Sequence, residues 1–286
     1  MNAKQMSGMP IAEKILEEVR NEAAALAVHG ITPGLGTILV GDDPNCQHYV
    51  NKKHSTCETV GLNSFNINVS GSGVQQDLLD AVEEFNRNPK VHSFMIQSPV
   101  PPQFDFSEAV SRISPDKDAD GLHPYNLGKL VLQEDGPLPC TPAGIVEMLK
   151  YYEIPISGKH VVIVGRGPTL GRPLSLMLSM KRDYANAAVT VVHSGIRNIG
   201  DYTRIADVVI CGVGIPNFIK PDMVKDGCIA ISGGISWEGK KLIPDIDMGV
   251  GEKASWITSR LGGVGPTTVA MLLRNTVIAA KKLKRN

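Results

Sequence analysis

The stretch 158–173, GKHVVIVGRGPTLGRP, decides the fold of this 286-residue chain. Residues 161–164 form a continuous, mostly β-branched apolar run, which is typical of a strand buried on both faces of a parallel sheet. Gly165, Gly167 and Gly171 follow, and a glycine-rich turn before a helix lets the backbone approach a pyrophosphate. The spacing is one residue longer than the usual dinucleotide fingerprint, so an ordinary tight strand-to-helix turn remains the alternative.

The next apolar run, 188–192, ends at His193 and Ser194. A unit that binds NAD carries an Asp or Glu here for the ribose 2′-hydroxyl, and this chain has none. The Ser194 hydroxyl, with Arg166 and Arg197 within reach, suits a 2′-phosphate instead. The sequence therefore favours NADP over NAD.

Two further apolar runs, 206–211 and 227–231, continue the alternation of strands with short helices. This alternation predicts a Rossmann-type, doubly wound parallel sheet in the C-terminal part of an α/β protein. A length of 286 residues is enough for two domains, each with its own core.

Charge and cysteine content exclude several classes of function. The 29 basic and 29 acidic residues cancel, so no bulk attraction to nucleic acid or to an anionic membrane is indicated. The basic tail 281–285 suits the C-terminal end of a helix. Five cysteines without C-x-x-C spacing argue against a disulfide framework or a zinc site. With no signal peptide and no spanning apolar run, we expect a soluble, cytoplasmic protein without a bound metal.

The N-terminal half also alternates strands and helices. A helix is expected at 10–28, a strand at 36–40, a turn at 41–45 and a helix at 46–60. Tyr49 and Lys53 stand four residues apart and so share one face of the last helix, just past the carboxyl end of a strand, where open α/β sheets bind ligands. A solvated lysine and a half-buried core aromatic are the alternatives.

Two more polar residues stand at ends of expected elements. A strand is expected at 64–69, a helix at 74–86 and a second strand at 93–97. Gln97 closes this second strand before the proline loop 98–102. Its amide is placed to bind a ligand or a neighbouring lysine, or to cap the loop backbone. The loop 114–121 begins like a calcium-binding EF-hand, but Leu127 stands where a bidentate Glu is required, so we reject calcium. Asp120 remains a candidate ligand-facing carboxylate.

The chain enters and leaves its C-terminal part through two glycine- and proline-rich segments. The segment 138–144 opens a helix that ends near Tyr152, with Thr141 as the expected N-cap and Pro142 at the first helical position. The glycines of 261–268 suggest close backbone approach to a ligand. The final helix, expected at 269–283, has an apolar side formed by Ala270, Leu273, Val277 and Ala280 and is expected to pack back across the domain junction.

Together these motifs resemble the bifunctional methylenetetrahydrofolate dehydrogenase/methenyltetrahydrofolate cyclohydrolase family, and the resemblance covers nearly the whole chain. The six ordered motifs that carry it are Val40-Gly41-Asp42-Asp43-Pro44 leading to Tyr49-Val50-x-x-Lys53, Gln97-x-Pro99-x-Pro101, Asp118-Ala119-Asp120-Gly121-Leu122, Pro139-Cys140-Thr141-Pro142-x-Gly144, Gly165-Arg166-Gly167 and Gly262-Gly263-Val264-Gly265-Pro266.

The resemblance implies a role for each matching residue. Tyr49 would lie against the p-aminobenzoyl ring of the folate, Lys53 would be the catalytic amine, Gln97 would orient it and Asp120 would hold the pterin. The remaining substrate-binding residues would be Pro99, Gly262, Gly263 and Pro266. The NADP site would be lined by Gly165, Arg166, Gly167, Ser194 and Ile235.

The resemblance also implies the domain organisation. A folate-binding catalytic domain is expected at 1–140 and an NADP-binding Rossmann-type domain at 141–265, with the helix 266–286 packing back onto the junction. The two α/β domains would face each other across a cleft. The protein would be a homodimer that binds tetrahydrofolate derivatives and no nucleic acid or membrane.

The chain departs from the family pattern at several positions. The family usually has Ser at Cys46 and at Gly167, and often Met at Thr267. Residues 232–235 (Ser-Gly-Gly-Ile) replace the usual Asp-Val-Gly-Ile, and 259–261 (Ser-Arg-Leu) replace Pro-Val-Pro. The changes at 232 and at 259–261 flank the expected nicotinamide and folate contacts.

Two other functions are compatible with the sequence. One is a two-domain NADP-dependent dehydrogenase of a small carboxylic acid, with Lys53 and Asp120 as its acid/base pair. The other is a folate- or nucleotide-binding homologue that has lost turnover, which the changes at 232 and 259–261 motivate.

Overall fold

A computed structural model describes residues 3–239 and 241–283 of the chain, which divide into two compact units. The N-terminal unit comprises Glu13–Leu138 and Val269–Asn286, and the C-terminal unit comprises Met1–Ala12 and Pro139–Thr268. The predicted boundary at 140/141 differs from this division chiefly in the first twelve residues. They group with the C-terminal unit because the strand β1 (Lys4–Met6) pairs with β11 (Trp256–Thr258).

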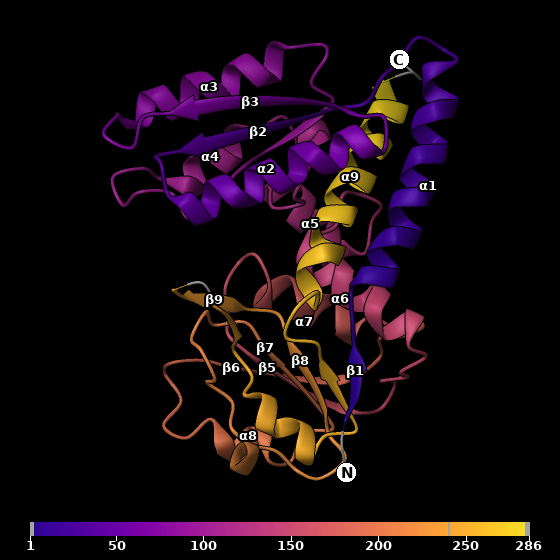
Figure 1. Cartoon of the computed structure of the whole chain (residues 1–286), viewed down its shortest axis with the longest axis vertical. Coiled ribbons are helices and arrows are strands. Elements are labelled where there is room, and N and C mark those ends of the chain that lie inside the picture. The colour runs from indigo at the N-terminus through magenta and orange to yellow at the C-terminus, as the bar shows by residue number, and fades with distance from the viewer. Residues whose placement is uncertain (1–2, 240, 284–286) are drawn as a thin grey trace. The chain divides into compact units, whose positions relative to one another are not determined.

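The N-terminal unit is built on a three-stranded parallel sheet in the order β3-β2-β4, of which Figure 1 shows β2 beside β3. Gly36 of the central strand has to be glycine, because a Cβ there would lie 2.7 Å from Phe94 Cβ and 2.9 Å from the Phe85 ring. Those two rings meet edge to face with centroids 5.4 Å apart and anchor the core on this side of the sheet. The strands and helices of this unit are β2 (Gly34–Val40), β3 (Asn63–Val69), β4 (Ser93–Ile96), α1 (Met9–Ala27, of which the first four residues belong to the other unit), α2 (Pro44–Thr59), α3 (Gln75–Arg87), α4 (Phe106–Arg112), η1 (Pro115–Lys117), α5 (Pro124–Leu132) and all but the first turn of α9 (Val264–Leu283).

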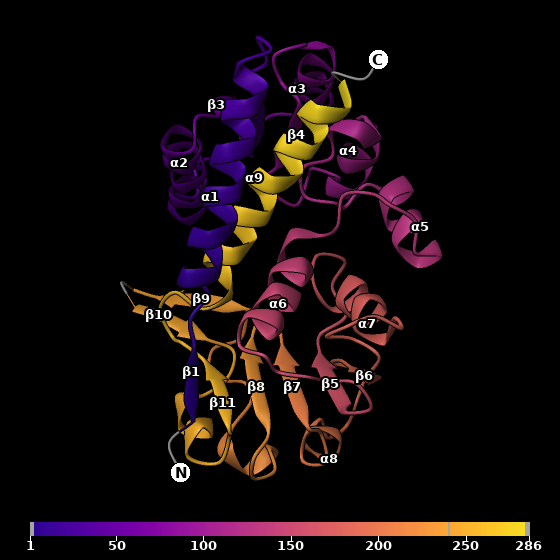
Figure 2. The same cartoon turned by 90° about the vertical axis from the view of Figure 1, so that its right-hand side faces the viewer.

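The helix α9 lies beside α1 in both views of the molecule (Figures 1 and 2). Within the N-terminal unit Arg274 pairs with Glu18 at 2.6 Å and Lys281 with Glu22 at 2.7 Å. The predicted apolar side of this helix is buried. Two basic residues of the predicted tail, Lys281 and Lys282, stand in the last turn of α9, whereas Lys284 and Arg285 lie outside the described residues.

The C-terminal unit holds a six-stranded sheet in the order β1-β11-β8-β7-β5-β6, and every pairing is parallel (Figure 2). Residues 161–164 of β5 (His160–Val164) are fully buried, as expected for a strand covered on both faces. The predicted α/β class, with two domains and a doubly wound parallel sheet, is confirmed. The other strands and helices of this unit are β6 (Ala188–Val192), β7 (Val208–Cys211), β8 (Ile229–Ser232), β9 (Ile235–Glu238), β10 (Lys241–Pro244), α6 (Cys140–Tyr151), α7 (Gly171–Ser179), α8 (Gly200–Thr203), η2 (Pro221–Met223) and η3 (Met248–Glu252).

Two predicted helix starts are wrong. The helix α6 begins at Cys140 with Pro139 at the N-cap, so Thr141 lies inside the first turn, where its hydroxyl accepts a hydrogen bond from Thr268 at 3.2 Å. The helix α9 begins at Val264, five residues earlier than predicted. Glycine and proline at first-turn positions conceal a helix start, because the first four N–H groups need no helical partner.

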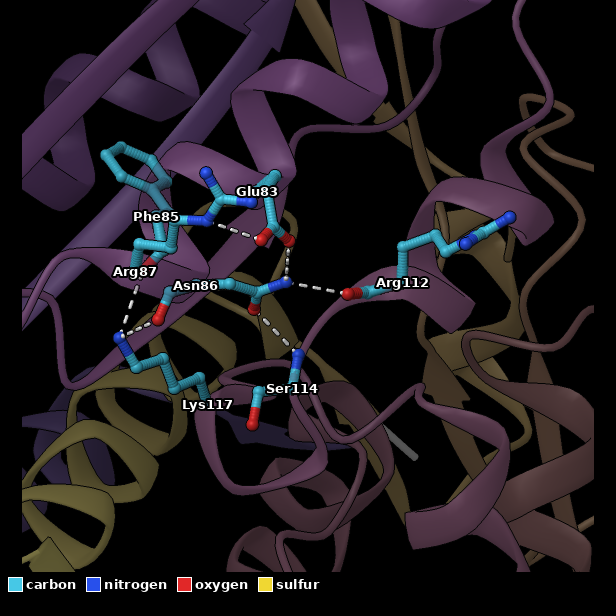
Figure 3. Close-up of polar contacts among 7 residues, drawn as sticks. All are labelled: Glu83, Phe85, Asn86, Arg87, Arg112, Ser114 and Lys117. Atoms are coloured by element: carbon cyan, nitrogen blue, oxygen red, sulfur yellow. Dashed lines mark hydrogen bonds and ion pairs between the residues drawn. The ribbon is translucent and has the colours of Figure 1, made fainter.

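The loop that leads toward Asp120 is fastened to the end of α3 (Figure 3). Lys117 Nζ donates to the carbonyl oxygens of Phe85, Asn86 and Asn88 at 2.8–3.0 Å. The Asn86 side chain accepts from Ser114 N at 2.8 Å and donates to the carbonyl of Arg112 at 2.8 Å. Burial lowers the pKa of Lys117, but the ammonium caps the carbonyls of Phe85 and Asn86 at the end of the helix and adds a second donor to the Asn88 carbonyl, which also accepts from Val91 N at 3.2 Å.

Lys117→Met is therefore expected to lower the free energy of unfolding by about 2–3 kcal/mol, since hydrogen bonds to a charged donor are lost and carbonyls are left unpaired. Lys90→Met, at an exposed lysine nearby, serves as the control and should stay within about 0.5 kcal/mol of wild type. Chemical denaturation of the three proteins measures the difference. Equal midpoints for the two variants would show that the cap is dispensable.

Candidate active site

Lys53 and Gln97 form the central contact of the N-terminal unit. The helix α2 is capped by Asp43, whose carboxylate accepts from Asn45 N at 2.7 Å and Cys46 N at 3.0 Å. Lys53 lies two helical turns after Cys46 and is 8 % exposed. Its Nζ donates to Gln97 Oε1 at 2.7 Å. The alternative of a solvated helix lysine is therefore wrong.

The orientation of the Gln97 amide is fixed by a second hydrogen bond. Its Nε2 donates to the carbonyl of Ser98 at 2.7 Å, which leaves Oε1 to face the amine. Gln97 comes directly after the last residue of β4, so the proline loop that follows holds its backbone. The side chain is thus available to orient a proton-transferring amine and is itself unable to titrate.

Tyr49 and Cys46 lie on the same face of α2 as Lys53. Tyr49 is half-buried, and burial raises the pKa of its phenol. The Cys46 thiol lies 3.9 Å from the carbonyl of Ser98 and 4.0 Å from that of Pro99, and burial raises its pKa, with a smaller contribution from Asp43. Both groups are therefore kept neutral beside the amine. Pro99 itself is exposed.

Asp120 stands in a loop that runs beside β4. Asp118 forms a parallel bridge with Phe94, so two residues further on Asp120 comes level with Ile96, the last residue of the strand. The loop is shaped by the buried Asp118 carboxylate, which accepts from the backbone N–H groups of residues 121, 122 and 123 at 2.8–3.2 Å. We did not predict this role of Asp118 from the sequence, although a carboxylate two residues before Asp-Gly is a signal of a turn held by its own side chain.

The glycine-rich turn of the C-terminal unit follows β5 and opens α7. Gly165 has a φ of 116°, which a side chain would strain, and a Cβ on Gly171 would collide with the Gly165 carbonyl. Gly167 faces open space. The turn is thus tightly wound and leaves its outer surface bare, as a phosphate-binding turn requires.

Arg166 of this turn meets His193 at the end of β6. Arg166 Nη1 lies 3.4 Å from His193 Nε2, and His193 Nδ1 accepts from the backbone N–H of Gly195 at 3.1 Å. Since Nδ1 is the acceptor, Nε2 of the neutral ring carries the proton, and two donors face each other. Such a pair fits an anionic oxygen that lies to one side of both donors and accepts from each, beside the exposed Ser194. His193 was missing from the predicted site residues.

A second loop at the carboxyl edge of the sheet is held by Asp245. This fully buried carboxylate accepts from Val213 N at 2.6 Å and Gly214 N at 2.9 Å, and burial raises its pKa. A Cβ on Gly234 would collide with it. In the strand order 6-5-7-8 the switch point lies between β5 and β7, so this loop and the turn at Gly165 flank the place where open α/β sheets bind nucleotides.

Ser232, at a position where the chain departs from the family pattern, is fully bonded. Its Oγ accepts from Asp245 N at 2.9 Å and donates to the carbonyl of Gly234 at 3.0 Å. Ile235 follows at the start of β9 and is 37 % exposed. The serine therefore preserves the turn that leads to the expected coenzyme contact.

The glycine cluster before α9 also belongs to the C-terminal unit. Gly262 has a φ of 69° and accepts at its carbonyl from Gly8 N at 2.7 Å, while a Cβ on Gly263 would lie 2.7 Å from the Ser259 carbonyl. Pro266 stands in the first turn of α9 and is half-buried. The structure thus brings Lys53 and Gln97 together in one unit and Arg166 and His193 together in the other.

Neither a metal cluster nor a membrane helix is found in residues 3–239 and 241–283. No group of three or more His, Cys, Asp or Glu side chains there could hold a metal ion, and no helix has the length and apolar character to cross a bilayer. All five cysteines are buried, and none of them forms a disulfide.

Comparison with known proteins decides the family. Residues 6–120 match the tetrahydrofolate dehydrogenase/cyclohydrolase catalytic domain, and residues 139–284 match the NAD(P)-binding domain of the same family. The chain belongs to the tetrahydrofolate dehydrogenase/cyclohydrolase family. The resemblance inferred from the six motifs is confirmed.

Relatives cover the chain from end to end. The bifunctional protein FolD of Syntrophotalea carbinolica is 60 % identical over 285 residues, which are 100 % of this chain and 98 % of that protein. The crystal structure of the bifunctional enzyme FolD from Campylobacter jejuni is 39 % identical, with a TM-score of 0.92 over 98 % of this chain and 99 % of that one. FolD of Trypanosoma brucei, solved with NADP and an inhibitor, is 33 % identical, with a TM-score of 0.93 and full coverage of both chains.

Proposed function

We propose that this protein oxidises 5,10-methylenetetrahydrofolate to the 5,10-methenyl compound with NADP⁺ and hydrolyses that product to 10-formyltetrahydrofolate. The observation that carries the proposal is the buried contact of Lys53 with the fixed amide of Gln97 in a chain of this family. Removing an ammonium from water costs several kcal/mol, and a neutral amide offsets only part of that cost, so an ordinary core would not bury a lysine in this way.

The oxidation needs positioning and no general base. Hydride loss from the methylene carbon leaves a cation delocalised over two nitrogens, so no proton has to be removed. Bound NADP⁺ supplies the hydride acceptor. Tyr49 would lie against the p-aminobenzoyl ring and Asp120 would bind the pterin, with Pro99, Gly262, Gly263 and Pro266 completing the substrate contacts.

The hydrolysis does need proton transfer, and Lys53 is placed for it. As water adds to the methenyl carbon, the neutral amine takes a proton from that water. The ammonium then gives a proton to the folate nitrogen whose bond to carbon breaks. The hydroxyl on that carbon releases its remaining proton to solvent as it becomes the carbonyl, which leaves the formyl group on the other nitrogen. Gln97 holds the amine in place through both transfers, because its carbonyl oxygen accepts from Nζ whether or not the amine is protonated.

The residues of the C-terminal unit fit NADP. Gly165 and Gly167 would let the backbone approach the pyrophosphate, and Ile235 would contact the nicotinamide end. The donors of Arg166 and His193, with the Ser194 hydroxyl beside them, would bind the 2′-phosphate. The NADP in the Trypanosoma brucei FolD structure supports the choice of NADP as the coenzyme.

The family resemblance supports two further proposals, and the five buried cysteines, none in a disulfide, support the first of them. The protein would act in the cytoplasm, where thiols stay reduced. It would also be a homodimer.

A spectrophotometric assay of the purified protein tests the proposed oxidation. Methylenetetrahydrofolate with NADP⁺ should give reduced coenzyme, and NAD⁺ in parallel should react more slowly. A panel of small 2-hydroxy acids, each tested with NADP⁺, should give no reduced coenzyme. Reduction by the acids alone would favour the carboxylic-acid dehydrogenase, and binding of folate and NADP⁺ without turnover would favour a non-catalytic homologue.

A further inference from the structure

The amine of Lys53 has a second neighbour on β4. Its Nζ lies 3.0 Å from the thioether sulfur of Met95, in addition to 2.7 Å from Gln97 Oε1. Gln97 follows Met95 by two residues, at the end of β4 where the extended chain still bonds to β2 through Gln97 N and the Ile38 carbonyl, so the two side chains leave the same face. Phe94 and Ile96 point to the core on the other face. The strand thus presents two acceptors in a row to one ammonium.

A thioether is an unusual partner for a buried amine. It is uncharged and a weak acceptor, so it holds the donor in place with much less preference for the charged form than a carboxylate would show. Met95 is itself buried, at 6 % exposure, and strand pairing fixes its backbone opposite Thr37. The buried thioether therefore restricts the swing of the long, otherwise flexible side chain of Lys53.

We propose that Met95 is a positioning residue for the hydrolytic step, and that its sulfur together with Gln97 Oε1 fixes Lys53 Nζ where the amine meets the attacking water. This inference rests on the proposed function, since it assigns Met95 to the step that Lys53 performs. It differs from a packing role, because a leucine would fill the same space without accepting a hydrogen bond.

Met95→Leu tests the proposal, with hydrolysis of added methenyltetrahydrofolate measured as a function of pH. We expect kcat to fall about three- to tenfold with KM changed less than about twofold, as losing one weak hydrogen bond in the transition state would give. The acidic limb of the kcat profile should move to lower pH by a few tenths of a unit, because the acceptor that is lost favours the protonated amine over the neutral one. The other titratable groups nearby, Cys46, Tyr49 and His54 on α2 and Asp120 in the loop beside β4, are unchanged.

Two further variants separate positioning from packing. Met148→Leu removes a fully buried methionine of α6, in the other unit, and should leave kcat, KM and the pH profile unchanged. Met95→Gln restores an acceptor of similar reach and should recover most of the lost kcat. The proposal would be overturned if Met95→Leu had the same kcat and pH profile as Met148→Leu, or if it changed only KM. If the wild-type protein does not hydrolyse methenyltetrahydrofolate at all, the proposed function fails first and this inference fails with it.

Discussion

Lys53→Met is expected to remove cyclohydrolase activity while measurable NADP⁺ reduction remains. The hydrolysis requires a group that takes and returns a proton, and the methionine side chain cannot titrate. The oxidation requires only that the folate and the coenzyme be held in register. Loss of a positioned acid/base group lowers a rate by about 10²- to 10⁴-fold, so the variant should hydrolyse methenyltetrahydrofolate no faster than buffer does.

The neighbouring Lys52 provides the matched control. Its side chain is exposed on the same turn of α2, so Lys52→Met removes an equal charge from the helix without touching Gln97. Hydrolysis by this control should match wild type. Retention of both activities in Lys53→Met, measured as coenzyme reduction and methenyl loss in parallel, would exclude Lys53 as the catalytic amine.

Arg166→Ala is expected to weaken the binding of NADP⁺ far more than the binding of NAD⁺. The guanidinium is one of two donors that converge beside Ser194, and it would bind a 2′-phosphate that NAD⁺ lacks. Loss of a charged hydrogen bond of about 1.5–3 kcal/mol corresponds to about a 10- to 150-fold rise in KM for NADP⁺, against a change of less than about threefold for NAD⁺.

Arg182→Ala is the control for lost positive charge, since Arg182 is exposed in the loop after α7 and should leave the coenzyme preference alone. Steady-state kinetics with each coenzyme at saturating folate measure the ratio. An unchanged NADP⁺/NAD⁺ preference in Arg166→Ala would show that the 2′-phosphate is bound elsewhere.

The sequence predicted those features of the fold that depend on neighbours along the chain. The buried strand β5 was predictable because β-branched residues run without a break between turn residues. The Lys53–Gln97 contact could be anticipated because a helix face and a strand end both terminate at the carboxyl edge of a parallel sheet. The strand β1 could not be predicted, since it has three residues and its partner β11 lies about 250 residues away.

The site residues that sequence reasoning missed are ordinary in sequence and distinctive only in space. Met95 alternates with Phe94 and Ile96 and looks like any core residue of a strand until Lys53 is placed against its sulfur. His193 gains a role only when the tautomer set by Gly195 N turns a donor toward Arg166. In the sequence Asp245 looks like any acidic loop residue. Only the structure shows that its buried carboxylate accepts from the backbone N–H groups of Val213 and Gly214. In each case the partner is at least 27 residues away.

Product analysis of one reaction tests the bifunctional assignment most directly. The protein is incubated with methylenetetrahydrofolate and NADP⁺, and NADPH, methenyltetrahydrofolate and 10-formyltetrahydrofolate are quantified over time, with Lys53→Met as the baseline for spontaneous hydrolysis. We expect NADPH and 10-formyltetrahydrofolate to rise together in a ratio near one, with little methenyl compound accumulating in the wild-type reaction and much more in the variant. Methenyltetrahydrofolate accumulating equally in both reactions, or no NADPH in either, would contradict the account.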